Sequence, residues 1–238
     1  MLYHKQTAEF IATVAQNMPE ISDEVMQNWI ENPRGLQKFL AGLCPCVHGP
    51  DISAQRQLQE WDSFYKKRFG LTIGDVAVPD HQPGFDRLIV VANGLTLNRV
   101  YDACQKQFKC WRYKDDLDKD VATNDRDPAN GTYAIWVRDR QEADEENKNL
   151  SADQLATRQV NGTTLMERML YELKYFDETG NHLDIRSATL CSGSRDSGGD
   201  VPNAHWCDGE FGVGWGRSGR RDGGLRARSV VSLPTESR

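Results

Sequence analysis

Two clusters in the chain contain side chains of the types that bind metal ions. Cys44, Cys46 and His48 lie close together, and the loop from Asp115 to Gly131 carries a series of aspartates. Structural zinc sites usually pair their ligands at C-x2-C spacing and need a second pair, whereas this cluster has C-x-C spacing and no second pair follows. The aspartates lack the alternating ligand order, central glycine and terminal glutamate of an EF-hand loop. We therefore expect neither a metal ion nor a cofactor.

The charge of the chain argues against polyanions as partners. The net charge is -6, and binding to phosphates requires clustered basic residues. One local exception is a run of five arginines interrupted by a single acid, Asp222. Such a run usually marks a solvated loop, so we expect no nucleic-acid or membrane partner. The five are Arg217, Arg220, Arg221, Arg226 and Arg228.

The lack of recognisable targeting signals and the scattered cysteines indicate a reducing compartment. The first residues lack a basic region followed by an apolar run of signal-peptide length, and no stretch has the length and apolarity of a membrane span. The six cysteines are scattered rather than arranged as a disulfide framework. We expect a cytoplasmic protein with free thiols.

The elements that must position any site change in character along the chain. Up to Gly70 the apolar residues recur at helical spacing, and beyond it short apolar runs are typical of strands, such as Arg87 to Ala92 before the turn dipeptide Asn93-Gly94. The expected fold class is α+β, with a helical N-terminal region over 1–70 and a binding domain over 71–238. The helical stripes lie at 10–18, 25–30, 36–43 and 58–65.

The second half has the clearest local signals. Residues 132–138 alternate as a strand does, with both faces at least partly covered. Ser151-x-x-Gln154 and Thr164-x-x-Glu167 are capping-box patterns, and the second begins an amphipathic helix that Gly180 ends. We predict that this helix, 164–179, packs against a sheet containing 132–138 and a terminal strand at 225–231.

From Ser187 onward the composition differs from that of the rest of the chain. Ten of the 20 glycines lie between Gly193 and Gly224. The last Gln, Met and Lys of the chain are Gln159, Met169 and Lys174. The absence of these three residue types from the remaining sequence sets the segment apart.

The segment from Asp200 to Val231 resembles the C-terminal variable region of C-type-lectin-fold proteins that retroelements diversify. Gly224-Leu225-Arg226 matches the G-[LF]-R strand that closes the fold in that family. The resemblance implies a lectin-like domain with a mixed or antiparallel sheet and a Gly-rich display region over 193–224. It also implies a ligand-binding function, with a protein or other macromolecule as the partner.

The family's diversification chemistry explains the composition. Adenines of a template are randomised, so codons of the A-A-pyrimidine kind change to codons that never encode Lys, Gln, Met, Glu or Trp. From Asn203 to Gly224 only Trp206, Glu210 and Trp215 lie outside the accessible set. The resemblance thus implies that Trp206 and Trp215 are scaffold residues. The implied ligand-binding positions are Asn203, Ala204, His205, Cys207, Gly209, Gly212, Gly214, Arg217, Ser218, Arg220 and Arg221.

Lectin-type calcium binding is not expected. The sugar-binding branch of the family uses E-P-N or Q-P-D and W-N-D tripeptides, where this chain has Val201-Pro202-Asn203 and Trp206-Cys207-Asp208. Val201 supplies no carboxylate for a calcium ion.

Two enzyme classes share pieces of the sequence. Asp196-Ser197-Gly198-Gly199 is similar to the G-D-S-G-G segment of chymotrypsin-like serine proteases, but Arg195 precedes it and no A-H-C motif supplies a base. Cys191 and Cys207 stand where formylglycine-generating enzymes carry a cysteine pair, without the surrounding residues of that family. We expect a binding protein and no enzyme. The alternatives left open are an interaction domain with a fixed partner and a formylglycine-generating-like enzyme.

Overall fold

The computed structural model describes residues 22, 26–27, 30–31 and 52–234. The chain divides into a unit over Met1–Pro50 and a unit over Asp51–Arg238. The helices expected at 10–18, 25–30 and 36–43 lie almost wholly outside the described residues. In the second unit the helices are α4 (Ile52–Phe69), α5 (Leu97–Gln105), α6 (Leu117–Asp120), α7 (Ala152–Thr157) and α8 (Leu165–Thr179), with short 3-10 turns η1 (Pro128–Asn130) and η2 (Glu145–Asn147).

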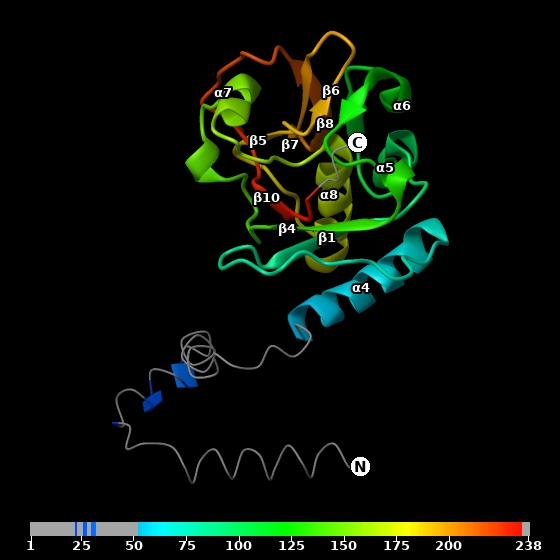
Figure 1. Cartoon of the computed structure of the whole chain (residues 1–238), viewed down its shortest axis with the longest axis vertical. Coiled ribbons are helices and arrows are strands. Elements are labelled where there is room, and N and C mark those ends of the chain that lie inside the picture. Colours follow the sequence, from blue (N-terminus) through cyan, green and yellow to red (C-terminus); the bar gives the residue numbers. More distant parts are fainter. Residues whose placement is uncertain (1–21, 23–25, 28–29, 32–51, 235–238) are drawn as a thin grey trace. The chain divides into compact units, whose positions relative to one another are not determined.

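The strands of this unit form three sheets (Figure 1). A three-stranded antiparallel sheet has the order β1-β4-β10, a five-stranded mixed sheet has the order β2-β8-β7-β5-β9, and β3 pairs with β6. The fold class is therefore α+β, as predicted. The strands are β1 (Arg87–Val91), β2 (Cys110–Arg112), β3 (Thr123–Asn124), β4 (Tyr133–Val137), β5 (Ala188–Leu190), β6 (Ser194–Arg195), β7 (Val201–Cys207), β8 (Glu210–Gly216), β9 (Leu225–Arg226) and β10 (Val230–Ser232).

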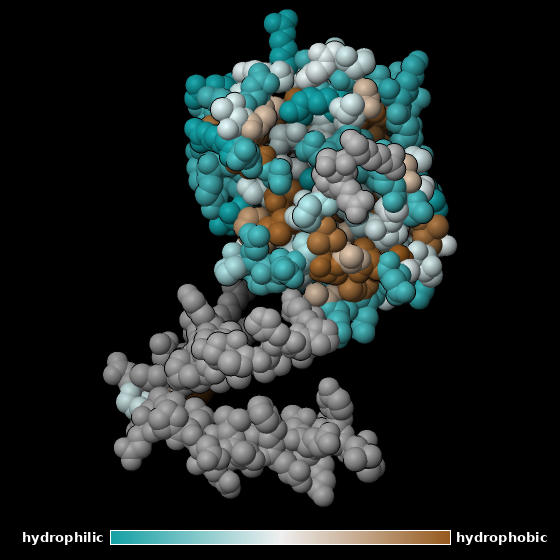
Figure 2. All heavy atoms as spheres, in the orientation of Figure 1, coloured by the Kyte–Doolittle hydropathy of each residue, from teal (hydrophilic) through white to brown (hydrophobic). Residues whose placement is uncertain are grey.

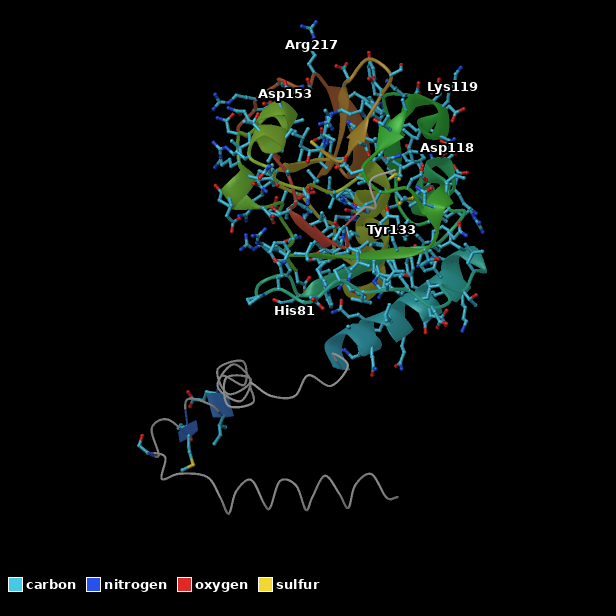
Figure 3. All side chains as sticks on the ribbon, viewed as in Figure 1. His81, Asp118, Lys119, Tyr133, Asp153 and Arg217 are labelled. Atoms are coloured by element: carbon cyan, nitrogen blue, oxygen red, sulfur yellow. The ribbon has the colours of Figure 1, made fainter. Side chains whose placement is uncertain are left out.

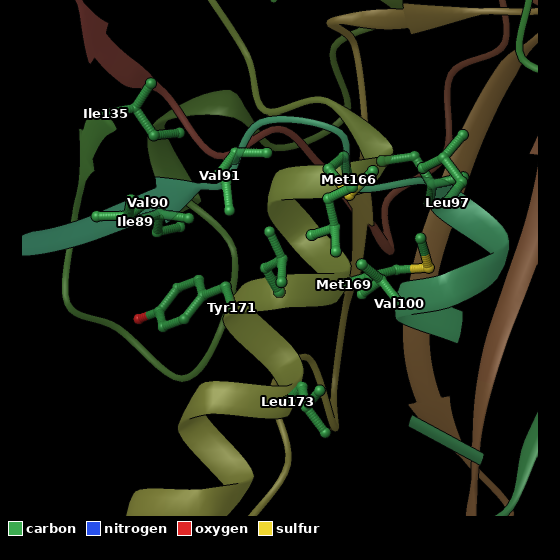
Figure 4. Close-up of a cluster of buried hydrophobic side chains, with 14 of the residues drawn as sticks. Ile89, Val90, Val91, Leu97, Val100, Ile135, Met166, Met169, Tyr171 and Leu173 are labelled. Atoms are coloured by element: carbon green, nitrogen blue, oxygen red, sulfur yellow. The ribbon is translucent and has the colours of Figure 1, made fainter. Parts of the chain in front are cut away.

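Helix α8 forms the centre of the main core. Its N-terminus carries the predicted capping box between Thr164 and Glu167, and Gly180 ends it with φ 68°. The helix contacts α5, β1 of the three-stranded sheet and β7 of the five-stranded sheet. Figure 4 shows Met166 and Met169 of α8 beside Leu97 and Val100 of α5, and core residues of β1 and β4 complete the same cluster. The helix thus joins the two larger sheets instead of covering one of them.

Helix α4 closes the free edge of the three-stranded sheet. The Gln57 side chain accepts a hydrogen bond from the Leu88 N–H at 2.8 Å, and Trp61 Nε1 donates to the Leu88 carbonyl at 2.9 Å. One turn further along, the Tyr65 hydroxyl donates to the Val90 carbonyl at 2.8 Å. Unpaired backbone groups of an edge strand are costly when buried. These contacts tie α4 to the second unit, so the division at Pro50 falls earlier than the expected boundary after residue 70.

The expected terminal strand at 225–231 is wrong as a single element. Leu225–Arg226 belongs to the five-stranded sheet and Val230–Ser232 to the three-stranded sheet. Between them, Arg228 turns into the core, where its guanidinium donates to the carbonyls of Arg140 and Gln141 at 2.9 and 2.8 Å. Arg228 thus lies where the chain passes from the five-stranded sheet to the three-stranded sheet.

A buried ion network holds the end of the chain against α8. Asp184 accepts hydrogen bonds from Arg168 Nε at 2.9 Å and Arg228 Nη2 at 2.6 Å, and the Thr189 hydroxyl also donates to it. Arg168 reaches Glu172 at 2.9 Å. All five side chains are at most 1% exposed, and a buried charge needs such paired partners to be tolerated.

Candidate functional site

Strands β7 and β8 form a tight hairpin that carries most of the predicted site. Cys207 pairs with Glu210, and the two residues between them, Asp208 and Gly209, have φ of 53° and 80°. Positive φ at both central residues characterises a type I′ turn, for which Asp-Gly is a preferred dipeptide. Gly209 therefore serves the turn, and this dipeptide is a sequence signal by which the hairpin could have been found.

Alternation along β7 separates the candidate residues onto two faces. Asn203, His205 and Cys207 share the outer face, whereas Ala204 and Trp206 face the main core. Ala204 is fully buried. The prediction that Ala204 contacts a ligand does not fit this position, because its methyl group packs against the core.

Glycines of β8 allow the outer side chains of β7 to lie flat across the sheet. His205 pairs with Gly212 and Asn203 with Gly214. A Cβ atom added at Gly212 would stand 3.2 Å from His205 Cε1, and one added at Gly214 would stand 3.0 Å from Asn203 Oδ1. The side chains of His205 and Asn203 therefore lie close over these glycines and form the upper layer of this face, and they would have to shift slightly to admit a side chain there.

The edge strand β2 adds two aromatic residues that the sequence analysis missed. Trp111 pairs with Gly212 in the parallel register and is 46% exposed. Tyr113, two residues later, is 70% exposed, and the two ring centroids lie 6.5 Å apart. The W-x-Y spacing was the available signal, because residues two apart share one face of an extended strand.

Only part of the outer face is covered. A second hydrophobic cluster joins Leu190 of β5 and Leu225 of β9 to Leu155 of α7 and its neighbours, and so covers the β5–β9 side of the sheet. Beside it lies a hollow of about 340 Å³, whose lining includes Asn203, His205, Arg220 and Ile185. We call the uncovered part, formed by Trp111, Tyr113, Asn203, His205 and the β8 glycines, the open face.

The arginine run divides into two groups with different roles. Arg226 pairs with Glu145 at 2.6 Å and Arg228 is buried, so the expectation of a solvated loop is wrong for these two. Arg217, Arg220 and Arg221 are exposed beside the open face. Arg217 projects outward from this end of the domain (Figure 3). Hydrophilic residues predominate at the same end in Figure 2.

The side chains of the loop after β8 approach the open face from one side. Arg220 Cδ lies 3.4 Å from the position of a Cβ at Gly216, so Arg220 extends the layer formed by His205 and Asn203. Ser218 donates to Asp153 Oδ2 at 3.2 Å. Arg221 donates to the Asn149 carbonyl. The structure thus places Arg220 against the hairpin, whereas Ser218 and Arg221 are bonded to Asp153 and Asn149.

His205 is a polar group within this layer. Burial, and secondarily the charge of Arg168, lowers the pKa of His205. Its Nδ1 atom is buried and has no hydrogen-bond partner within 52–234. Buried polar atoms are usually bonded to protein or water, so this Nδ1 atom is unusual in lacking a partner.

The two predicted scaffold residues lie beneath the open face. Trp206 stacks on His182 with ring centroids 3.3 Å apart, and Lys114 Nζ lies 4.2 Å from the centroid of the Trp215 ring. Both tryptophans are partly buried against the main core. Trp206 also lines the hollow that Asn203 and His205 border.

Cys191 and Ser197 are the residues considered as catalytic nucleophiles, and each lies in an environment that serves the structure of the protein. Burial raises the pKa of the Cys191 thiol to about 12, which keeps it in the unreactive protonated form. Ser197 is exposed next to Asp196, whose carboxylate accepts from the Gly198 and Asp200 N–H groups and binds Lys114 at 2.7 Å. None of the histidines in the described part of the chain hydrogen-bonds to either nucleophile.

Metal-ligating side chains do not gather in one place within the described residues. Among the described residues no group of three or more His, Cys, Asp or Glu is placed to hold a metal ion. Cys44, Cys46 and His48 lie outside those residues. Asp116 instead caps α6 through the Lys119 N–H, and Asp118 accepts from the Leu97 N–H at 2.6 Å.

The described helices also include none long and apolar enough to cross a bilayer. No family model matches the chain, and no curated protein or solved structure is significantly similar to it.

Proposed function

We propose that this chain is a ligand-binding protein that presents the open face to a protein partner, on a C-type-lectin-like fold whose display region is diversified by a retroelement. The observation that carries the proposal is the grouping of Asn203, His205, Gly212 and Gly214 on one uncovered face of the hairpin. These positions, which the resemblance implies, lie opposite one another on the two strands of the hairpin.

The division of labour within the hairpin supports a display role. Side chains on the outer face of β7 make few core contacts, whereas Phe211 and Val213 on the inner face of β8 are fully buried. Surface substitutions usually change stability by about 0.5 kcal/mol or less. The outer layer can therefore vary while the core keeps the fold, which is the requirement for a diversified surface.

Exposed aromatic residues give such a surface binding energy. Trp, Tyr and Arg are the residue types most often found at the energetic centres of interfaces, and the open face combines Trp111 and Tyr113 with Arg220. A fixed aromatic edge beside variable polar positions can supply affinity to many ligands while the neighbouring side chains select among them.

A pair of matched libraries tests this proposal. One library randomises Asn203, His205 and Arg220 on the outer face, and the other randomises Ala204, Phe211 and Val213 on the inner face. Both are displayed on phage, challenged with protease, and selected against a panel of unrelated folded proteins.

The outer-face library should stay largely protease-resistant and yield specific binders, while the inner-face library loses its fold. If the outer-face library is digested as readily as the inner one, the display function is refuted. If it stays folded but yields no binder to any panel member, an interaction domain with a fixed partner becomes the better account.

A further inference from the structure

Three of the four edges of the two larger sheets are bonded to other parts of the chain. Helix α4 covers β1. The Asn161 carbonyl accepts the Val230 N–H of β10 at 2.9 Å, and the Asn149 N–H donates to the Leu225 carbonyl of β9 at 3.0 Å. The fourth edge is β2, whose strand partner within 52–234 is β8 alone. An open edge strand is a template for pairing with another chain.

The unpaired side of β2 consists of backbone groups of Cys110 and Arg112. On the paired side, the Lys109 carbonyl and the Tyr113 N–H bond to β8 at 2.8 and 3.0 Å. The backbone groups of successive residues point to opposite sides of a strand, so those of Cys110 and Arg112 point away from β8. No strand of the described residues pairs with that side. The N–H and C=O groups of both residues are therefore free to bond to a further strand.

The basic side chains of the edge are engaged within their own chain. Charged side chains often protect an edge strand from pairing. Here Arg112 Nη1 donates to Asn98 Oδ1 at 3.0 Å, and the guanidinium lies 4.5 Å from the centroid of the Tyr101 ring. Lys114 Nζ lies 2.7 Å from Asp196 Oδ2. Neither cation is a free charge that would keep another strand away.

The side chains on the outer face of β2 are suited to pairing. Lys109, Trp111 and Tyr113 are exposed, whereas Cys110 and Arg112 between them are half-buried. Aromatic pairs on neighbouring strands stabilise antiparallel sheets, and the Trp111 ring has no strand beside it on the side away from β8. The strand thus combines free backbone groups with exposed aromatic side chains.

In one antiparallel register the strand is complementary to itself. Residues whose backbone groups point outward must meet each other, so a register centred on Trp111 pairs Cys110 of one copy with Arg112 of the other. The two Trp111 side chains then face each other at a position without backbone hydrogen bonds, where side chains approach most closely. Lys109 lies opposite Tyr113, which allows a cation–π contact. Like charges are not placed opposite each other within this strand.

We propose that two copies of this chain associate through β2, with a two-fold axis at Trp111 that joins their five-stranded sheets into one continuous sheet. The axis is perpendicular to the sheet and therefore turns the same face of both copies to one side. The two open faces adjoin along a seam of aromatic side chains, and the dimer presents a bivalent surface. The association goes beyond the proposed function, because it requires no ligand.

Sedimentation equilibrium of the full chain tests the association over about 1–300 μM, where weak complexes dissociate. A seam of one short strand is smaller than the roughly 1,200 Å² of stable interfaces. The average mass should therefore rise gradually with concentration, from 26.9 kDa toward twice that value.

Two substitutions at equally exposed apolar side chains locate the interface. Trp111→Lys places like charges at the axis and should weaken association about tenfold or more. Leu233→Lys is the matched control, because Leu233 is 44% exposed and Trp111 46%, and it lies outside β2. The control should associate like wild type. Circular dichroism melts check that both variants are folded.

Disulfide cross-linking tests the register. Chains that carry Cys207→Ser with either Lys109→Cys or Tyr113→Cys are oxidised with diamide, each alone and as an equal mixture. The introduced thiols face each other only in the mixture, which should therefore form a linked dimer several times faster than either chain alone. The native thiols are the same in all three reactions and set the background rate.

Three results overturn the inference. A wild-type chain that stays monomeric over the whole concentration range does not pair through β2. A dimer that Trp111→Lys weakens no more than Leu233→Lys forms elsewhere on the chain. A mixture that cross-links no faster than the single chains rules out the self-complementary register. Each of these results leaves the proposed function standing, because the two libraries test ligand binding without reference to the oligomeric state.

Discussion

Replacing Asp184 with Asn removes one negative charge from the buried network without changing the shape of the side chain. Asp184 is the only carboxylate in the network that bonds both Arg168 and Arg228. After the substitution, Glu172 is the one remaining acid bonded to this pair of arginines. The protein must then bury an uncompensated positive charge.

The expected cost follows from this imbalance. Removing one partner of a buried ion pair typically destabilises a protein by about 3–5 kcal/mol. In a domain of this size, each kcal/mol lowers the Tm by about 2–4 °C, so we expect a fall of roughly 6–20 °C. The free energy of unfolding of a typical protein is roughly 5–15 kcal/mol, so the expected loss is a large share of it.

The assay is urea and thermal unfolding at pH 7, followed by circular dichroism. Asp153→Asn is the control, because Asp153 is an exposed carboxylate bonded to a neutral hydroxyl, and its loss should change stability by about 0.5 kcal/mol or less. Adding Arg228→Met to Asp184→Asn should cost less than the sum of the two single changes. If Asp184→Asn has the same Tm and the same free energy of unfolding as the control, the network is not a determinant of stability.

The same residue predicts a dependence on pH. Burial by itself would raise the pKa of Asp184, but the charges of Arg228 and Arg168 and the Thr189 hydrogen bond outweigh it and lower the pKa. A lowered folded-state pKa means that the contribution is complete above the unfolded value of about 3.9. This contribution to stability is lost as the pH falls toward the pKa that Asp184 has in the folded state. The stability gap between wild type and Asp184→Asn should therefore stay constant from pH 7 down to about pH 4 and narrow below it.

Three further predictions concern the core, the display surface and the thiol. Leu173 is fully buried beside the sheets, and Leu173→Ala should lower the free energy of unfolding by roughly 2–5 kcal/mol in a urea titration. Trp215→Ala should lower the Tm more than the combined change of Arg217 and Arg220 to Asp; the reverse order would mean that scaffold and surface are exchanged. Iodoacetamide at pH 8 should leave Cys191 unmodified in the folded protein and alkylate it in urea, as mass spectrometry would show.

Local signals in the sequence were sufficient for several elements. The capping boxes at Ser151 and Thr164 and the terminal Gly180 are present as predicted, because a cap is formed by residues within a few positions of one another. The alternating strand at 132–138 became β4 for a similar reason, since its pattern lies within one short segment. The resemblance implied the hairpin positions of the open face, Asn203, His205, Gly212 and Gly214, but not Trp111 or Tyr113.

Other features depended on which segments meet in space. The sequence contained Arg228 as one arginine in a run, and only the position of Asp184 on a distant loop made it a buried ion that divides the terminal strand. Trp111 joined the open face because β2 pairs in parallel with β8, a contact between residues far apart in the chain. Ala204 and His205 are equivalent in composition arguments, yet the pairing of β7 with β8 sends one into the core and the other to the surface. Strand partners and the burial of charges are decided by long-range packing, for which a single sequence carries no local signal.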